Sequence, residues 1–168
     1  MQPMKILEHN HEDFRLTQLM GIVTRHMKLA INKNIARENI QLEFQHWIIL
    51  KYLDSNTGSP QCEIAKHGKK NKTSITRMIN TMEKMDLVVR KSNKLDKRNR
   101  LIFLTPKGHA LSESVTPIVF RTIDAIEKGI DSREVIIAEN VLFKMFENIK
   151  LLMSEPLENS QNQEEQHV

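Results

Sequence analysis

The chain has 168 residues, of which 39% are hydrophobic, and its formal charge at neutral pH is +4. This length accommodates one domain with a sizeable buried core. The single cysteine, Cys62, excludes an internal disulfide and favours a reducing compartment. No apolar run approaches the roughly 18 residues that span a bilayer, and the N-terminal residues lack the apolar core of a signal peptide. We therefore expect a cytoplasmic protein with no membrane partner.

The first two elements predicted along the chain are helices. Apolar residues recur at three- and four-residue steps over about 12–37 and 41–54. Ser59 followed by Pro60 is typical of a helix N-cap with proline at the first helical position, so a short third helix is expected after them. Asn71 is a candidate N-cap for a fourth helix over about 72–85. The inward face of that helix is predicted to be Ile75, Met78, Ile79 and Met82.

The pattern then changes to two short β-type runs, at 88–92 and 100–105, joined by a polar connection of hairpin length. Thr105 and Pro106 are expected to cap a fifth helix. The order of helices around a two-stranded hairpin is the layout of a winged helix-turn-helix. The predicted fold class is therefore mainly α with a small β-hairpin wing, in which the winged helix-turn-helix core is flanked by long N- and C-terminal helices.

The last predicted helix follows a short break in the chain. Gly129 is expected to end the fifth helix, and Asp131 with Glu134 resembles a capping box that begins the sixth. Apolar residues at helical spacing continue to about residue 152. The residues from 154 onward have little to bury and are expected to be disordered.

The positive charge is concentrated in one third of the chain. Residues 61–110 contain 13 basic and 4 acidic side chains, a net charge of +9, whereas the rest of the chain carries −5. A basic segment of this kind is the electrostatic footprint expected for an anionic partner such as nucleic acid. A solvated basic surface gives the same count, so charge alone leaves both interpretations open.

The predicted fourth helix carries a polar face opposite its apolar face. Arg can donate two hydrogen bonds to guanine, Asn can pair with adenine, and Thr offers a hydroxyl and a methyl group. This composition predicts contact with a major groove through Lys72, Thr73, Ser74, Thr76, Arg77, Asn80 and Lys84. A solvated helix is the alternative, but such a helix more often carries Glu/Lys pairs, and the one acid here is Glu83. The preceding lysines, Lys66, Lys69 and Lys70, are expected at phosphates.

The connection between the two β-type runs is the second candidate contact with DNA. A loop with stacked positive charge can reach a minor groove, where the negative potential favours arginine. The predicted wing contacts are Lys94, Lys97, Arg98 and Arg100. Asp96 would be repelled by phosphate, so we expect it either to pair with a wing arginine and hold the loop or to act as an Asx-turn residue.

Residues 59–111 resemble the winged-helix core of the MarR (multiple antibiotic resistance regulator) family, and with the flanking helices the resemblance extends over about 12–153. The matching pieces are Glu63-Ile64-Ala65, Thr73-Ser74-Ile75-Thr76-Arg77, Met82-Glu83-Lys84, Leu87-Val88, Asp96-Lys97-Arg98 and Leu104-Thr105-Pro106-Lys107-Gly108. The chain departs from the family pattern at two positions. Asp86 stands where the family often has a helix-ending glycine, and Asn99 interrupts the usual arginine run of the wing.

The resemblance implies a bacterial or archaeal transcription regulator that binds a pseudo-palindromic operator in double-stranded DNA as a homodimer. Such proteins are commonly repressors, relieved by a small phenolic, lipophilic or oxidising effector, and no cofactor is required. The implied organisation is a flexible arm at 1–11, a dimerisation helix at 12–37, a DNA-binding domain at 38–106, dimerisation helices at 107–153 and a tail at 154–168. The alternative is a winged-helix module that binds another protein and no specific DNA.

No catalytic or metal site is predicted. The sequence contains no Gly-rich phosphate loop, nucleophile elbow or paired-carboxylate arrangement, so we expect no enzyme activity. His9 and His11 form a pair of potential metal ligands, but no Cys or fixed carboxylate is in register with them. Cys62 is interpreted as a structural or incidental thiol, because a redox sensor would need a lowered thiol pKa.

Overall fold

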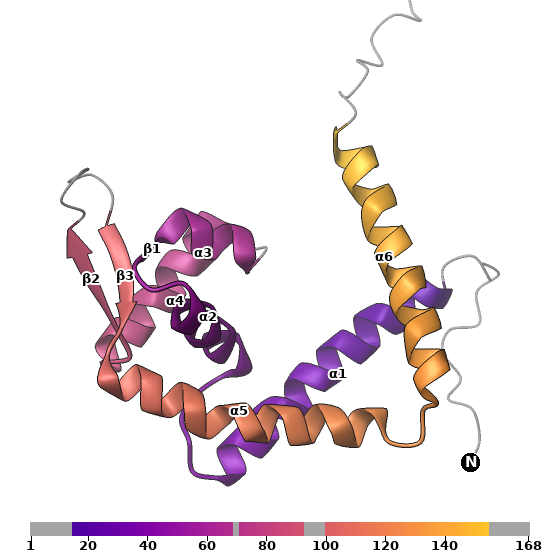
Figure 1. The fold of residues 1–168 in the computed structure, drawn as a ribbon, viewed down its shortest axis with the longest axis horizontal. Helices are drawn as coiled ribbons and strands as arrows, with labels where there is room; N and C mark the ends of the chain where they lie inside the picture. The colour runs from indigo at the N-terminus through magenta and orange to yellow at the C-terminus, as the bar shows by residue number, and fades with distance from the viewer. Residues whose placement is uncertain (1–14, 69–70, 93–99, 155–168) are drawn as a thin grey trace, which may run out of the picture. The chain divides into compact units, whose positions relative to one another are not determined.

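The computed structural model describes residues 15–68, 71–92 and 100–154. The elements in chain order are α1 (Arg15–Arg37), α2 (Phe44–Ser55), β1 (Ser59–Pro60), α3 (Gln61–His67), α4 (Lys72–Lys84), β2 (Val88–Ser92), β3 (Arg100–Leu104), α5 (Pro106–Glu127) and α6 (Ser132–Ser154) (Figure 1). They form two compact units, the first ending at Ile126 and the second beginning at Glu127. The predicted mainly helical fold with a small wing is confirmed. The predicted arm at 1–11, and the predicted tail apart from Ser154, lie outside the described residues.

The sheet of the wing has three antiparallel strands in the order β1-β3-β2, one more than the hairpin predicted. The extra strand corrects the interpretation of Ser59 as an N-cap. Ser59 pairs with Ile102 of β3, and its hydroxyl donates to the Asn56 carbonyl at 2.8 Å. Pro60 then occupies the N-cap position of α3. Proline is tolerated here because β1 is an edge strand, whose outer side needs no backbone donor.

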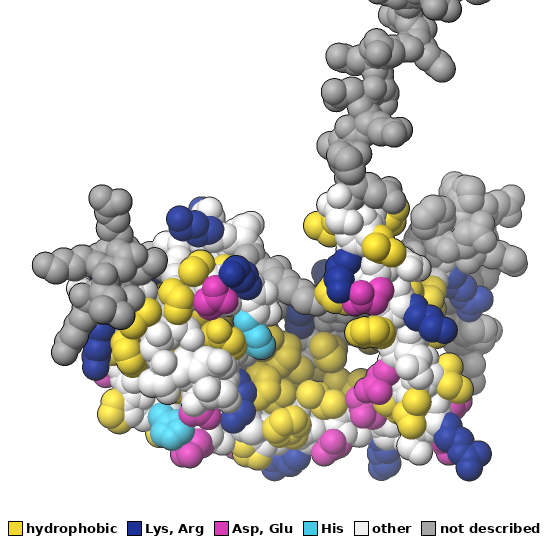
Figure 2. Space-filling view, turned by 45° about the horizontal axis from the view of Figure 1, so that its top comes forward, with side chains coloured by type: hydrophobic (Ala, Val, Ile, Leu, Met, Phe, Trp, Pro, Cys, Tyr) yellow, Lys and Arg dark blue, Asp and Glu magenta, His cyan; other side chains and the backbone are white. Residues whose placement is uncertain are grey.

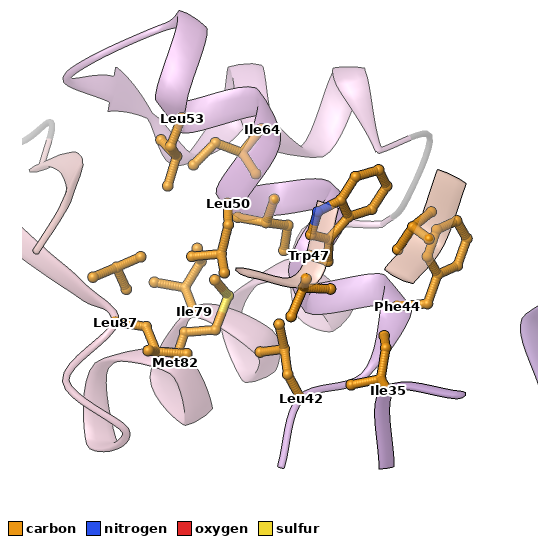
Figure 3. Close-up of a cluster of buried hydrophobic side chains, with 14 of the residues drawn as sticks. Ile35, Leu42, Phe44, Trp47, Leu50, Leu53, Ile64, Ile79, Met82 and Leu87 are labelled. Carbon is orange, nitrogen blue, oxygen red and sulfur yellow. The ribbon is translucent and has the colours of Figure 1, made fainter. Parts of the chain in front are cut away.

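The core of the first unit is built around the buried side chains of α2. Leu50 and Leu53 of α2 are fully buried and belong to one apolar cluster with residues from α1, α3, α4, α5 and β3 (Figure 3). The predicted inward face of α4 is confirmed, since Ile75, Ile79 and Met82 are completely buried and Met78 packs against the same cluster. Burial of this face fixes which side of α4 remains exposed.

Helix α1 is joined to α2 by a polar contact as well as by apolar packing. The N-cap residue of α2, Glu43, makes no side-chain capping bond. Instead, the Asn32 side-chain oxygen of α1 accepts a hydrogen bond from the Phe44 backbone N–H at 2.7 Å. One of the otherwise unpaired donors at the start of α2 is thereby satisfied from another helix. Ile31 and Ile35, also on α1, are fully buried in the core.

The start of α5 is anchored to the end of α4. Thr105 caps α5 as predicted, because its hydroxyl accepts from the Gly108 N–H at 3.0 Å, and the same hydroxyl donates to the Asp86 carbonyl at 2.6 Å. Asp86 has a φ of +58°, the left-handed conformation expected where the family often has glycine. Lys107 donates to the Met85 carbonyl at 2.8 Å. Two side chains therefore satisfy carbonyl groups at the C-terminus of α4.

Helix α6, taken by itself, has no buried residue. It begins as predicted after Gly129, whose φ is +85°, and at a capping box in which Asp131 accepts from the Arg133 N–H and Glu134 accepts from the Asp131 N–H. Hydrophobic side chains are visible over its surface (Figure 2). The exposed large ones are Ile136, Ile137, Val141, Leu142, Phe143, Phe146, Ile149, Leu151, Leu152 and Met153. Of the helices described, none is long and apolar enough to cross a membrane.

Candidate nucleic-acid interface

The N-terminus of α4 is held by the predicted cap. The Asn71 side-chain oxygen accepts a hydrogen bond from the Ser74 N–H at 2.8 Å. The first turn of α4 contains no acidic residue, so the partial positive charge of the helix N-terminus is not offset there. Lys72 adds a full charge at the first helical position. This end of the helix is therefore electrostatically suited to a phosphate group.

The outward face of α4 is polar and exposed. Because Ile75, Ile79 and Met82 point into the core, residues offset from them by about half a helical turn face solvent. The exposed predicted contacts are Lys72, Thr73, Arg77, Asn80 and Lys84. Within the described part of the chain, the three basic side chains of this row have no carboxylate partner. They are thus free to meet an external anion.

Two of the predicted base contacts are half-buried. The Thr76 hydroxyl donates to the Lys72 carbonyl at 2.8 Å and accepts from the Gln61 side-chain amide of α3 at 2.6 Å. Its hydroxyl therefore joins α3 to α4. Ser74 is half-buried beside the N-cap. The sequence pattern could not show the Thr76 contact, because Gln61 belongs to a different helix.

One side chain of the wing that the sequence analysis did not single out contacts the exposed face of α4. Arg90, in β2, forms an ion pair with Glu83 and donates to the Asn80 side-chain oxygen at 2.7 Å. The one acid of α4 is therefore neutralised by a base from the wing. The charge count of the sequence includes Arg90. Its two partners, however, lie seven and ten residues earlier in the chain, so these contacts depend on how β2 packs against α4.

Only part of the predicted set of phosphate contacts can be placed. Lys66 is exposed on α3 and forms an ion pair with Glu63 at 2.9 Å between Nζ and Oε1. The hydrogen bond and the charge of Glu63 raise the pKa of Lys66. An exposed pair of this kind is weak, so it leaves Lys66 able to exchange its partner for a phosphate. Lys69 and Lys70 lie outside the described residues.

The two main wing strands are paired up to their ends, where Ser92 of β2 stands opposite Arg100 of β3. Arg100 is exposed at this end of the sheet. Nearby, the Lys91 ammonium lies 5.0 Å from the centroid of the Phe103 ring. The other predicted wing residues, Lys94, Asp96, Lys97 and Arg98, fall outside the described part of the chain.

The elements of the interface together carry a clear excess of positive charge. Helices α3 and α4 with strands β2 and β3 contain seven basic side chains and two acidic ones. Both acids, Glu63 and Glu83, are paired with basic neighbours. Part of the excess that the sequence shows for residues 61–110 is therefore carried by these elements. Such a surface attracts the phosphate backbone irrespective of base sequence.

No group of three His, Cys, Asp or Glu side chains that could hold a metal ion occurs in 15–68, 71–92 and 100–154. His9 and His11 are not among the described residues. Cys62 is a free, exposed thiol on α3.

Comparison with known proteins agrees with the geometry. Residues 42–99 match the model of the MarR family. The HTH-type transcriptional regulator FarR of Neisseria gonorrhoeae is 25% identical over 137 residues, which are 75% of this chain and 94% of that protein. The family match covers α2, β1, α3, α4 and β2.

Solved structures show the same fold. A complex of S. aureus MepR with DNA has a TM-score of 0.74 at 21% identity and covers 81% of this chain and 99% of that one. A mutant MarR from E. coli with operator DNA has a TM-score of 0.73 at 21% identity, covering 80% and 99%. BpsR of Bordetella bronchiseptica, whose DNA binding is regulated by 6-hydroxynicotinic acid, has a TM-score of 0.73 at 18% identity, covering 82% and 96%. The chain therefore has the winged helix-turn-helix fold of these DNA-binding regulators, and its residues 42–99 match the MarR family.

Proposed function

We propose that the protein represses transcription by binding a pseudo-palindromic operator as a homodimer, with α4 of each protomer in the major groove. The observation that carries this proposal is the exposed row on α4, in which Lys72, Arg77 and Lys84 lack a carboxylate partner within the described residues. In a bacterium or archaeon, this repressor would act in the cytoplasm, where the chromosome lies.

Some residues of the interface would contact base edges, and others would contact phosphates. Arg77 offers a bidentate donor to guanine, and Asn80 and Thr73 would contact neighbouring base edges. Lys72, Lys84 and the α3 lysines would neutralise phosphates and set the register. The wing residues Lys94, Lys97, Arg98 and Arg100 would reach the minor groove, with Asp96 shaping the loop. Ser74 and Thr76 would add contacts through their exposed atoms, since the Thr76 hydroxyl is already engaged by Gln61.

Dimerisation is supported by the apolar surface that the chain leaves uncovered. On α6, ten large hydrophobic side chains are exposed, and α1 exposes Leu16, Val23 and Leu29. Exposed large hydrophobic side chains in this number are rare on a monomer and mark an interface. A two-fold axis through it would present two recognition helices about one DNA turn apart, which is the spacing a pseudo-palindromic operator requires.

A small phenolic or lipophilic effector would relieve repression. Support comes from BpsR, a protein of the same fold whose DNA binding is regulated by 6-hydroxynicotinic acid, an aromatic acid with a hydroxyl group. A panel of hydroxylated aromatic acids and neutral lipophilic compounds, added to the protein–DNA complex, tests this step. Release of DNA by one class and not by the other identifies the chemistry of the effector.

The decisive experiment for the proposed function is footprinting on the DNA upstream of the gene that encodes the protein. We expect protection of an inverted repeat, with affinity that falls steeply as salt is raised because several phosphates are neutralised. The matched control is a scrambled repeat of the same base composition. Equal binding to both sequences at all salt concentrations would instead favour a winged-helix module that binds a protein partner.

A further inference from the structure

Arg90 occupies a sheltered position between the wing and the recognition helix. Its side chain is only 13% exposed although it carries a charge, and it lies at the third position of β2. Two groups of α4 satisfy it, the Glu83 carboxylate and the Asn80 side-chain oxygen, the latter at 2.7 Å from Nη2. Arg90 is thus held inside the interface.

The chemistry of the contact fixes which end of the Asn80 amide faces Arg90. A guanidinium group has only donors, so the atom it meets must be the amide oxygen. The amide is planar, and its NH₂ group therefore points away from Arg90. Among the described residues, no acceptor is found for that NH₂ group, and Asn80 itself is exposed. In the free protein, the outward end of Asn80 is a hydrogen-bond donor.

We propose that Arg90 is a positioning residue that determines base specificity by holding Asn80 as a donor toward the major groove. This inference rests on the proposed insertion of α4. Glu83 supports the arrangement, because its carboxylate binds the second nitrogen of the guanidinium and limits its rotation. The wing strand would in this way influence base readout by the helix without touching the base.

The arrangement changes the base that Asn80 selects. A free Asn favours adenine, since its oxygen accepts from N6 while its NH₂ donates to N7. Because the bond from Arg90 turns the oxygen toward β2, the NH₂ group is the end of the amide that faces outward. This donor matches the acceptor edge of guanine, at O6 and N7, better than the mixed edge of adenine. Arg90 therefore selects against the adenine pairing that the sequence of α4 indicates.

The test is a double-mutant cycle in which the measured quantity is the preference of each protein for one base over the other three at each operator position. The proteins are the wild type, Arg90→Met, Asn80→Ala and the double variant, and each competes for operators in which one base pair of the half-site at a time is changed to the other three. For Arg90→Met we expect preference at one base pair to move toward adenine by roughly tenfold, because the amide oxygen is released. Asn80→Ala should abolish preference at that same base pair, and adding Arg90→Met to it should change nothing further.

Glu83→Gln is the matched control, because a glutamine oxygen still accepts from Arg90 and leaves the Asn80 contact in place. It should keep the wild-type preference, and thermal melting of all variants verifies that each is folded. A shift caused by Arg90→Met that persists undiminished in the Asn80→Ala background would overturn the inference, as would a preference unchanged by Arg90→Met. Absence of any base preference in the wild type would overturn the proposed function and this inference with it.

Discussion

Helices α4 and α6 have the same kind of amphipathic sequence but different surroundings. The apolar face of α4 is completely covered within its own unit by residues such as Leu50 and Leu87. The apolar face of α6 has no buried residue. An apolar stripe in the sequence therefore predicts which face of a helix is buried. Which residues bury it, from the same chain or from a second copy, depends on the rest of the molecule. Under the proposed function, the covered helix would present its polar face to DNA, and the uncovered helix would contact a second copy.

The largest expected difference between the two regions concerns the same substitution made in each. Leu50→Ala removes a fully buried side chain, so it should lower the free energy of unfolding by about 2–5 kcal/mol. Leu142→Ala, at a residue that is 42% exposed, should instead weaken self-association, with a tenfold change for every ~1.4 kcal/mol. Urea denaturation at several protein concentrations, with sedimentation analysis, separates the two effects. A loss from Leu142→Ala that is independent of protein concentration would mean that α6 is covered within its own chain.

A second contrast concerns the contact between α5 and the end of α4. A Cβ atom at Gly108 would lie 2.0 Å from the Leu87 carbonyl oxygen, which is backbone and cannot move aside alone. Gly108→Ala should therefore destabilise the protein by about 1–3 kcal/mol through overpacking. Gly21→Ala is the control, because nothing lies within 4 Å of its Cβ position, and removing a helical glycine should stabilise α1 by up to about 1 kcal/mol. Thermal unfolding should place the two variants on opposite sides of the wild type.

On the exposed face of α4, we expect base and phosphate contacts to differ in kind. Arg77→Ala should cost about 1–3 kcal/mol of binding free energy at one operator position and relax the base preference there. Lys72→Ala should weaken binding to all sequences alike and reduce the slope of log affinity against log salt by about 1. Gel-shift titrations at several salt concentrations measure both. If the two variants lower affinity uniformly and by the same amount, Arg77 does not read a base.

The smallest expected effect comes from a histidine in α2. Burial lowers the pKa of His46 below its usual value of 6.5, partly opposed by the Glu43 carboxylate, and His46 Nδ1 has no hydrogen-bond partner in the described part of the chain. The unfolded chain therefore binds the proton more readily. Stability should be complete above the unfolded pKa and decline as pH falls toward the folded pKa. Denaturation across this pH range should show a shallower decline for His46→Gln, and an identical decline would exclude His46 as a cause.

Much of the fold follows from local patterns in the sequence. Asn71, Thr105 and the Asp131/Glu134 pair cap their helices as predicted, because a cap depends on residues two or three positions apart. The apolar face of α4 follows from helical periodicity in the same way. The exposed row of α4 could be predicted for this reason, since it is the complement of the buried face.

Contacts between elements could not be predicted in this way. Ser59 and Pro60 have the chemistry of a helix start, yet β3 offers unpaired backbone groups, and pairing with it makes them a strand. Thr76 has the chemistry of a base contact, but Gln61 of α3 engages its hydroxyl. In the sequence, Arg90 is only one more positive charge. Its contact with Asn80 exists because β2 packs against α4. Each of these outcomes requires a partner from another element.

The sequence by itself determined the helices, their caps, the segment that carries the positive charge and the family resemblance. Backbone hydrogen bonds and side-chain periodicity within a helix reach only three or four residues, so they are readable without a fold. The tertiary structure alone decided which exposed polar groups are already engaged and which remain available to DNA. That decision depends on distances of about 3 Å between atoms far apart in the chain, which only packing of the core brings together.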